Sequence, residues 1–273
     1  GGQITFEPSM PVEGLPNRLA YAPDDRALTL ENLSVSEEGT LRIRVMVDGV
    51  ELAEAGPLII QAADHASFWG DLHGQTGETV GVNTIESYFD FARNKTFLDV
   101  SAHQGNDFQI NAAFWKHLNK VTATWDEPGR FTVFPGYEWS GNTAIGGDHN
   151  VYFAKEGQAI RRCSHALMED RSEMSSDANT LTALYAALRD EDVVIYAHVG
   201  GRYANIYYDH DPLLETAVEM HSAWGTFEWV LTDGFPLGRR VGVVCNSDGH
   251  KGRPAPAIPA RLHLDHWVVS PAF

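Results

Sequence analysis

Cysteine is scarce in this chain, and long apolar runs are absent. Only two cysteines occur among 273 residues, Cys163 and Cys245, and they lie far apart in the sequence. One disulfide remains possible, but two buried free thiols are favoured, so the redox compartment stays open. No stretch approaches the ~20 consecutive apolar residues that a membrane-spanning helix requires. We therefore expect an ordinary globular protein without a membrane partner.

Basic residues are few compared with acidic ones. Lys and Arg together number 20 against 37 Asp and Glu, which gives a formal net charge of −17. Such a chain is not expected to bind nucleic acid, because a phosphate backbone attracts a basic surface. An anionic small-molecule substrate would need local positive charge. Bound divalent cations, together with Arg202, Lys251 and Arg253, are the expected sources of that charge.

The sequence also lacks the short motifs of several common enzyme classes. It contains no Gly-x-Ser-x-Gly nucleophile turn, no Gly-x-x-x-x-Gly-Lys-Ser/Thr phosphate loop and no Gly-x-Gly-x-x-Gly after a strand. Cys245 lies within the apolar string VGVVCN, where a packed thiol is expected rather than a nucleophile. Serine or cysteine acyl transfer and dinucleotide binding therefore have no support.

Short apolar runs that end at, or lie beside, a metal-binding residue are the main positive feature. The seven runs are FWGDLH, FLDVSAH, FTVFPGYE, HNVYF, VVIYAH, AVEMH and VGVVCNSDGH. They supply His73, His103, Glu138, His149, His198, His221, Asp248 and His250. Continuous apolar runs are typical of parallel strands buried on both faces, and the carboxyl ends of barrel strands meet at one mouth. We expect these side chains to form a shared site for divalent metal.

Amphipathic segments follow most of these runs, at residues 84–95, 108–125, 180–190 and 226–235. Strand followed by helix, repeated, predicts a parallel α/β architecture. The first part of the chain differs, because residues 40–47 alternate apolar and polar side chains before a turn at Asp48-Gly49. We therefore expect a small antiparallel β module over residues 1–64, the α/β body over 65–253 and a Pro-rich tail over 254–273.

Two pairs of ligand-type residues are spaced two positions apart, Asp71 with His73 and Asp248 with His250. Side chains at this spacing can share one face where a strand ends. We therefore expect His73 to bind metal and Asp71 to orient His73 without binding the metal itself. Glu138 lies between two aromatic residues and would be costly to bury without a partner or metal, which favours a bridging ligand. His149 precedes its strand, so a ligand role and a structural role both stay open.

In combination these motifs resemble the polymerase-and-histidinol-phosphatase (PHP) family of metal-dependent phosphoesterases. The strings WGDLHGQT, HQGNDFQ, FPGYEWSGNT, AHVGGRYA, EMHSAWGTFEW and NSDGHKGRP look like an uncharacterised PHP-like branch of large bacterial proteins. The resemblance implies a distorted (β/α)7, TIM-like barrel with two or three Mn, Zn or Fe ions. By motif position, His73, Glu138, Asp248 and His250 match family ligands, and the remaining histidine places fall to His103, His198 and His221. The family pattern is His-x-His in the first motif, whereas Gln75 occupies the second place here.

On this basis we expect a hydrolase that cleaves an ester, preferably a phosphoester, with a metal-bridging hydroxide. Arg202 and Lys251 would hold the anionic group, Asp248 would orient or deprotonate the water, and Trp139 or Trp224 would wall the leaving-group pocket. Carboxylic or sulfate esters, lactones and amides remain alternative substrates. A non-catalytic metal-binding protein is a second alternative, favoured if Gln75 has weakened the cluster. A cytoplasmic location is expected, while the Gly-Gly start leaves a processed, exported form open.

Overall fold

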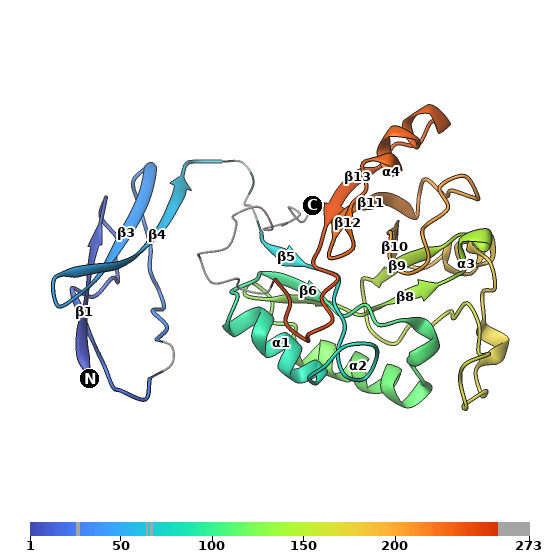
Figure 1. Ribbon diagram of the computed structural model, residues 1–273, viewed down its shortest axis with the longest axis horizontal. Coiled ribbons are helices and arrows are strands. Elements are labelled where there is room, and N and C mark those ends of the chain that lie inside the picture. The colour runs from blue at the N-terminus through green and yellow to red at the C-terminus, as the bar shows by residue number, and fades with distance from the viewer. Residues whose placement is uncertain (26–27, 64, 66–67, 256–273) are drawn as a thin grey trace. The chain divides into compact units, whose positions relative to one another are not determined.

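The chain divides into two compact units, Gly1–Ala66 and Ser67–Phe273, which are described separately. The computed structural model describes residues 1–25, 28–63, 65 and 68–255 (Figure 1). Most of the Pro-rich tail predicted over residues 254–273 therefore lies outside the described residues.

The first unit is a four-stranded antiparallel sheet with the order β2-β1-β3-β4. Its strands are β1 (Gly2–Pro8), β2 (Arg18–Tyr21), β3 (Gly39–Val47) and β4 (Val50–Ile60). The β3–β4 hairpin turns at Asp48 and Gly49, whose φ angles are 50° and 78°. Positive φ at both central positions is typical of the tight hairpin turn that Asp-Gly favours. The turn expected at these two residues is present.

The second unit contains a small parallel sheet and a larger mixed sheet. The small sheet has the order β5-β6-β7, with β5 (Gly70–Asp71), β6 (Val100–Ala102) and β7 (Thr132–Phe134). The larger sheet has the order β12-β11-β10-β9-β8, and β13 pairs with β11. Its strands are β8 (Gly136–Ser140), β9 (Asp148–Phe153), β10 (Val193–Ala197), β11 (Glu215–Ser222), β12 (Gly225–Thr226) and β13 (Gly242–Cys245). A mixed α/β fold is therefore confirmed.

The expectation of parallel strands throughout is wrong for β8 and β9. Strand β9 pairs antiparallel with both β8 and β10, whereas β10, β11 and β13 run parallel. The β8–β9 connection holds only a short 3₁₀ helix, Thr143–Ile145, and then Gly146 and Gly147, with φ angles of 133° and 78°. So short a connection cannot return a chain to a parallel neighbour.

A closed barrel is not found among the described residues of this unit. Between its two sheets, β-bridge pairing is limited to isolated bridges, which pair Gly74 with Gly249 and Asn106 with Glu138. Both bridges lie next to predicted metal ligands. The sheets therefore approach each other at the ends of their strands, where the candidate site lies.

The helices begin at polar capping residues and bury one apolar face. They are α1 (Ile85–Asn94), α2 (Ala112–Trp125), α3 (Leu181–Leu188) and the single-turn α4 (Trp229–Thr232). Thr84, Asn111 and Thr180 cap the first three by accepting a hydrogen bond from a backbone N–H three residues ahead. Such caps satisfy donors that a helix start leaves free, typically worth ~1 kcal/mol. Shorter 3₁₀ helices cover Asp107–Gln109, Met174–Ser176 and Phe235–Leu237.

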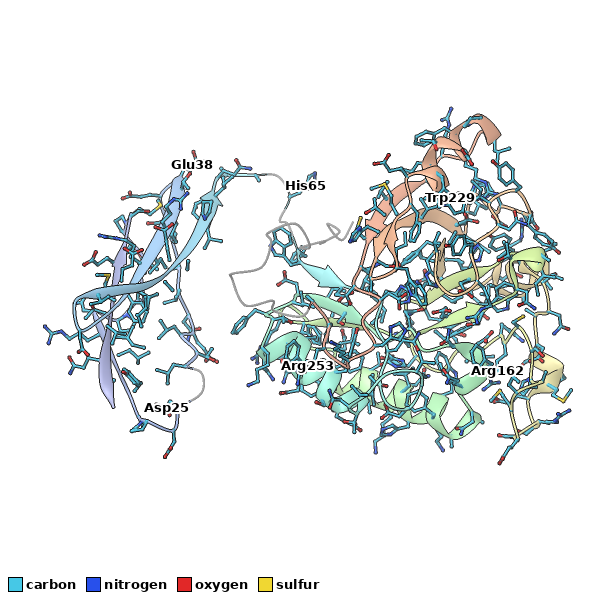
Figure 2. All side chains as sticks on the ribbon, in the orientation of Figure 1. Asp25, Glu38, His65, Arg162, Trp229 and Arg253 are labelled. Carbon is cyan, nitrogen blue, oxygen red and sulfur yellow. The ribbon has the colours of Figure 1, made fainter. Side chains whose placement is uncertain are left out.

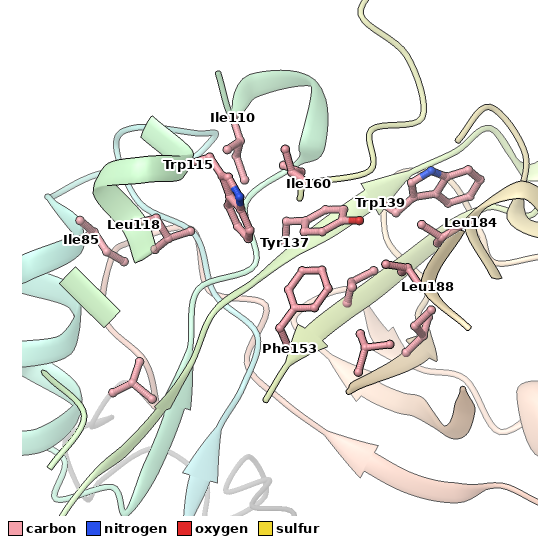
Figure 3. Packing of buried hydrophobic residues seen from close by; sticks show 14 of the residues in the cluster. Ile85, Ile110, Trp115, Leu118, Tyr137, Trp139, Phe153, Ile160, Leu184 and Leu188 are labelled. Carbon is pink, nitrogen blue, oxygen red and sulfur yellow. The ribbon is translucent and has the colours of Figure 1, made fainter. Parts of the chain in front are cut away.

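The main apolar core lies between β8, β9 and the helices α2 and α3 (Figure 3). Tyr137 and Trp139 leave one face of β8 and pack with Phe153, Trp115 and Leu184. All five are less than a tenth exposed, and burying an aliphatic or aromatic side chain of this size stabilises a fold by ~1.5–3 kcal/mol. Because this core takes the odd-numbered residues of β8, the even-numbered ones point toward the opposite face.

The last described residues are fixed against the first part of this unit. The backbone N–H of Ala255 donates to Oδ2 of Asp71 at 2.7 Å, and the guanidinium of Arg253 lies 5.9 Å from the ring centroid of Phe91 in α1. Figure 2 labels Arg253 beside these elements. These contacts hold the segment after β13 close to β5, and so hold Asp248 close to His73.

Candidate metal centre

His73 lies at the centre of a buried group of imidazoles and carboxylates. It follows β5 and is completely buried. Its Nδ1 lies 3.0 Å from Oε1 of Glu219, while its Nε2 lies 3.3 Å from Oδ1 of Asp248 and 3.6 Å from Oε2 of Glu138. If Nδ1–H donates to Glu219, Nε2 carries the lone pair. That lone pair then points between two carboxylates, as a metal ligand requires.

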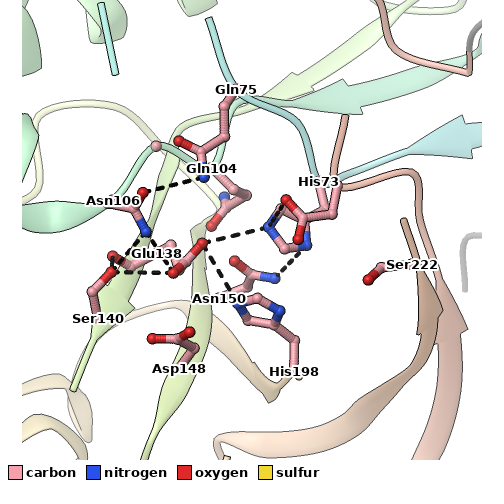
Figure 4. A network of polar contacts seen from close by, with 12 residues as sticks. His73, Gln75, Gln104, Asn106, Glu138, Ser140, Asp148, Asn150, His198 and Ser222 are labelled. Carbon is pink, nitrogen blue, oxygen red and sulfur yellow. Dashed lines mark hydrogen bonds and ion pairs between the residues drawn. The ribbon is translucent and has the colours of Figure 1, made fainter. Parts of the chain in front are cut away.

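Glu138 lies between His73 and His198 (Figure 4). Its Oε2 is 3.5 Å from Nε2 of His198, which directly follows β10. Its Oε1 accepts hydrogen bonds from Nδ2 of Asn106 and from Oγ of Ser140. The His73 and His198 rings lie edge to face, with centroids 4.6 Å apart. The carboxylate expected from the sequence to bridge ligands thus lies between two histidines.

Strand β9 contributes Asp148 and Asn150 to this face and not His149. In the β8–β9 register, Glu138 pairs with Asn150 and Ser140 with Asp148, whereas Trp139 pairs with His149. His149 therefore lies on the core face, where its ring contacts Trp139 and Tyr185 and its Nδ1 lies 3.0 Å from the Gly147 carbonyl oxygen. Both faces of β9 are buried, so alternation could not show which one meets the metal ligands.

Strand β11 contributes Glu219, a residue that the sequence reasoning missed. Glu219 pairs with Val244 and His221 with the next residue, Cys245, so Met220 is an extra residue in the ladder. Such a bulge shifts the alternation of side chains along the strand, so Glu219 and His221 face opposite sides of the sheet. His221 is partly exposed, and its Nδ1 lies 2.6 Å from Oγ1 of Thr226. Glu219 was visible only as a carboxylate inside the string AVEMH.

The segment after β13 places Asp248 against His73 and His250 farther out. Asp248 is almost fully buried and has a φ of 44°, a left-handed conformation that is uncommon for a residue with a side chain. Nε2 of His250 lies 3.9 Å from Oδ1 of Asp248. Asp71 does not contact the His73 ring. Its Oδ1 accepts hydrogen bonds from the backbone N–H of His73 and of Ser247, so it fixes the backbone on both sides of the site.

His103 and Gln75 are buried at the edge of this group. Both ring nitrogens of His103 have close partners, since Nε2 lies 3.1 Å from Oγ1 of Thr76 and Nδ1 accepts from the Gly105 backbone N–H. Nε2 of Gln75 donates to Oδ1 of Asn106 at 3.3 Å, which leaves its Oε1 without a hydrogen-bond partner. The structure brings both residues to the edge of the site and neither into direct contact with His73.

Among the described residues, two sets of three side chains have ligand atoms that all lie within 4.8 Å of one another. The first set is His73, His198 and Glu219, and the second is Glu138, Asp148 and His198. Neither His149 nor His221 belongs to either set. Asp148 and Glu219, which complete the sets, are the residues that only the register of β9 and β11 revealed.

Charge complementarity within the group shifts its pKa values strongly. Burial alone would lower the pKa of His73, but Asp248 and Glu219 outweigh it and raise that pKa well above its ordinary value. Burial would raise the pKa of Glu138, yet His198 and His73 hold it below its usual range. Burial and the nearby Glu138 raise the pKa of Asp148 to about 7. Each of these two carboxylates disfavours the charged form of the other, and a nearby cation relieves that repulsion.

A cavity of about 280 Å³ lies beside these side chains. Glu138, His198, Asp248 and His250 line it together with Arg202 and Trp224. Of the residues expected to hold an anion, Arg202 lines this cavity, whereas Lys251 is exposed and is not among the lining residues. Of the two tryptophans expected in a leaving-group pocket, only Trp224 contributes, because Trp139 is buried in the core.

The side chains at this site fit a divalent cation. Nε2 of His73, both ring nitrogens of His198 and Oδ1 of Asp248 are buried and lack a hydrogen-bond partner in the described part of the chain. A buried polar atom without a partner is unfavourable, and metal coordination would satisfy several of these atoms at once. Imidazole and carboxylate ligands suit Zn, Mn or Fe.

The sequence pattern of a family described as "Protein of unknown function (DUF3604)" matches residues 52–210. The chain belongs to this family. An uncharacterized protein of Chlamydia pneumoniae is 24% identical to this DUF3604 chain over 229 residues, which cover 80% of the chain and 35% of that protein. The chain thus spans about a third of the length of this relative.

Two solved structures resemble the DUF3604 chain. One is a two-domain protein of Bacteroides vulgatus that contains a domain predicted to be a PHP-like metal-dependent phosphoesterase. It is 10% identical with a TM-score of 0.44, and the match covers 68% of this chain and 53% of that one. The other, from Bifidobacterium adolescentis, is assigned to the metal-dependent phosphoesterases. It is 13% identical with a TM-score of 0.40, over 72% of this chain and 92% of that one.

Proposed function

We propose that this chain is a metal-dependent hydrolase that cleaves a small-molecule ester, with a phosphoester as the preferred substrate. The observation that carries the proposal is the buried group around His73, in which ring nitrogens that make no hydrogen bond face carboxylate oxygens at the wall of a cavity. Side chains that only stabilised the fold would satisfy one another's hydrogen bonds. The resemblance to PHP proteins supports the same reaction class.

A divalent Mn, Zn or Fe ion at this site would activate water near neutral pH and polarise the ester. His73, His198 and Glu138 would hold the cation, and Glu219 would keep the His73 ring in the required tautomer. Asp248, which reaches both the cavity and His73, would accept the proton of the attacking water.

The cavity wall indicates how an ester would be bound. Arg202 is the only Lys or Arg among the lining residues that the structure describes, so its guanidinium would contact the anionic oxygens of a phosphoester. Trp224, which is 53% exposed, offers an apolar surface for the leaving group. A phosphoester is therefore favoured over a neutral carboxylic ester, lactone or amide.

Nitrophenyl esters of phosphate, phosphodiester, sulfate and carboxylic acids test this proposal with the purified protein. Hydrolysis should be lost when a chelator removes metal and should return when Mn²⁺ or Zn²⁺ is restored. The phosphorylated substrates should react fastest. Activity that persists unchanged after chelation would contradict a metal-dependent reaction. Faster cleavage of the sulfate or carboxylic ester would contradict the preference for a phosphoester.

A non-catalytic metal-binding protein is the second candidate, favoured by the neutral Gln75 at the edge of the site. Gln75 lines the cavity and its Oε1 makes no hydrogen bond, so a ligand side chain at this position would face the site. The substitution Gln75→His adds an imidazole at that place. A hydrolase should change its metal content or its rate, whereas a protein that only binds metal should show no turnover before or after the substitution.

A further inference from the structure

The two sets of candidate ligands differ in whether a positively charged side chain already lies against their carboxylates. His73, His198 and Glu219 are contacted by neutral amides, since Asn246 donates to Oε2 of Glu219 and Asn150 lies against Nδ1 of His73. No Lys or Arg side chain within the described ranges has an ion pair with this set. The other set, Glu138, Asp148 and His198, has a permanent positive charge against both of its carboxylates, from Arg202.

Arg202 contacts these carboxylates through three separate groups. Its Nε lies 2.6 Å from Oδ1 of Asp148, and its Nη2 lies 3.2 Å from Oε1 of Glu138. Its backbone N–H also donates to Oδ2 of Asp148 at 3.0 Å. Both oxygens of Asp148 and one oxygen of Glu138 are therefore engaged by a single residue.

The loop that carries Arg202 is fixed in this position. The backbone N–H of Asp148 donates to the Arg202 carbonyl, and the N–H of His198 donates to the Asp148 carbonyl. Val199 and Tyr203 form an antiparallel bridge across the loop, and the guanidinium lies 5.4 Å from the ring centroid of Phe108. Arg202 is thus held in place from several sides.

Burial strengthens the effect that Arg202 has on metal binding at Asp148 and Glu138. Asp148 and Glu138 are almost completely buried, and Arg202 is roughly three-quarters buried, so their mutual attraction is weakly screened. A divalent cation beside the same two carboxylates would be repelled by the guanidinium. It would also have to replace hydrogen bonds that Asp148 already makes.

We propose that Arg202 acts as a built-in cation against Asp148 and Oε1 of Glu138, so that the resting protein binds one divalent ion tightly, beside His73 and His198. The proposal rests on the metal-dependent function above and names its metal requirement. Arg202 thus limits the number of metal ions as well as contacting substrate. The two or three ions implied by the family resemblance would need this guanidinium to move or to be removed.

The test is the number of Mn²⁺ or Zn²⁺ ions bound by the full chain, measured by calorimetry and by elemental analysis after gel filtration. The wild-type protein should bind one equivalent tightly. Arg202→Gln, which keeps a long polar side chain but removes the charge, should bind two. The second equivalent should bind at least about tenfold more tightly than any second equivalent in the wild type. No substrate is needed, so the readout is independent of hydrolysis.

Two further variants separate local charge from other effects. Arg202→Lys keeps a positive charge at the loop and should retain one equivalent. Arg240→Gln removes an exposed charge that lies outside the cavity lining and should also retain one. Circular dichroism of each variant checks that it is folded. If Arg202→Gln is misfolded, the wild-type and Arg202→Lys proteins still test the inference, because two tight equivalents in either of them would overturn it.

The outcomes distinguish this inference from the proposed function. Two tight equivalents in the wild-type protein, or one in both the wild type and Arg202→Gln, would overturn the role of Arg202 and leave a metal-dependent hydrolase intact. Binding of no metal by either protein would overturn both. Two equivalents in Arg240→Gln would show that overall charge, and not the guanidinium at Asp148, sets the number.

Discussion

Nδ1 of His73 lies 3.0 Å from Oε1 of Glu219, and this contact joins the segment that follows β5 to the middle of β11. Oε2 of Glu219 is held in turn by Nδ2 of Asn246 at 2.7 Å. A carboxylate behind a metal-binding histidine fixes the tautomer and the orientation of its ring. The two buried residues therefore set the direction of the His73 lone pair.

Glu219→Gln should lower the affinity for Mn²⁺ or Zn²⁺ by roughly 10–100-fold, because an amide cannot hold His73 in one tautomer as a carboxylate does. Calorimetric titration of the metal-free protein measures the change. Glu169→Gln, at an exposed position, is the matched control and should bind metal as the wild type does. Equal affinity in Glu219→Gln and the control would show that Glu219 neither binds metal nor orients its ligand.

Two adjacent glycines in the loop before Arg202 offer a matched pair. A Cβ atom at Gly200 would lie 2.6 Å from Cε1 of His198 and 3.1 Å from Oδ2 of Asp148, whereas one at Gly201 would meet nothing within 4 Å. Gly200→Ala should therefore displace His198 or Asp148 and weaken metal binding by about tenfold or more. Gly201→Ala should have little effect.

The same titration measures both glycine variants, and thermal unfolding reports whether each is folded. Unchanged metal affinity in Gly200→Ala would mean that His198 and Asp148 can shift without loss. Similar losses in both variants would instead point to the flexibility of the loop, since glycine has an unusually free backbone.

Asp107 should make the stability of the metal-free protein depend on pH. Its Oδ2 accepts hydrogen bonds from the backbone N–H groups of Ser140 and Cys163, while its Oδ1 is buried without a partner. Burial, with a smaller contribution from Glu138, raises its pKa to about 7. A carboxyl group whose pKa is higher in the folded state contributes stability that is fully present below its unfolded pKa of ~4 and is lost as the pH rises through about 7.

Asp107→Asn removes this proton, so the variant should lose less stability than the wild type between about pH 4 and pH 7. The difference in slope should approach, at most, about 1.4 kcal/mol per pH unit. Urea unfolding in the presence of chelator, at several pH values in this range, measures it. Parallel pH profiles for the two proteins would mean that Asp107 is ionised in the fold at neutral pH.

Metal binding should stabilise the second unit against unfolding. An ion that binds only the folded chain adds about 2.7 kcal/mol when its free concentration is 100 times its Kd, so chelation should lower the melting temperature. His73→Gln should abolish this difference. His117→Gln, which changes an exposed histidine paired with Glu86, should preserve it. A melting temperature that is insensitive to metal in the wild type would count against a structured metal site.

The sequence by itself determined the mixed α/β class, the position of several helices and part of the ligand set, although the segment expected to be helical over residues 226–235 contains, as α-helix, only the short α4 (Trp229–Thr232). The amphipathic pattern over residues 84–95 predicted α1 to within a residue, since Thr84 and Lys95 flank Ile85–Asn94. The ends of apolar runs likewise pointed to four residues of the site. Glu138, His198 and Asp248 line one cavity, and His73 lies against Glu138 and Asp248. These features depend on local spacing, which a linear sequence records directly.

Only the tertiary structure decided which face each strand residue occupies. The antiparallel β8–β9 pair turns Asp148 and Asn150 toward Glu138 and His149 toward the core, and the extra residue Met220 turns Glu219 inward and His221 away. Strands buried on both faces carry no alternation that could reveal this, and a bulge is defined by its partner strand. The position of Arg202 on Asp148 likewise depends on a loop fold that joins residues distant in the chain.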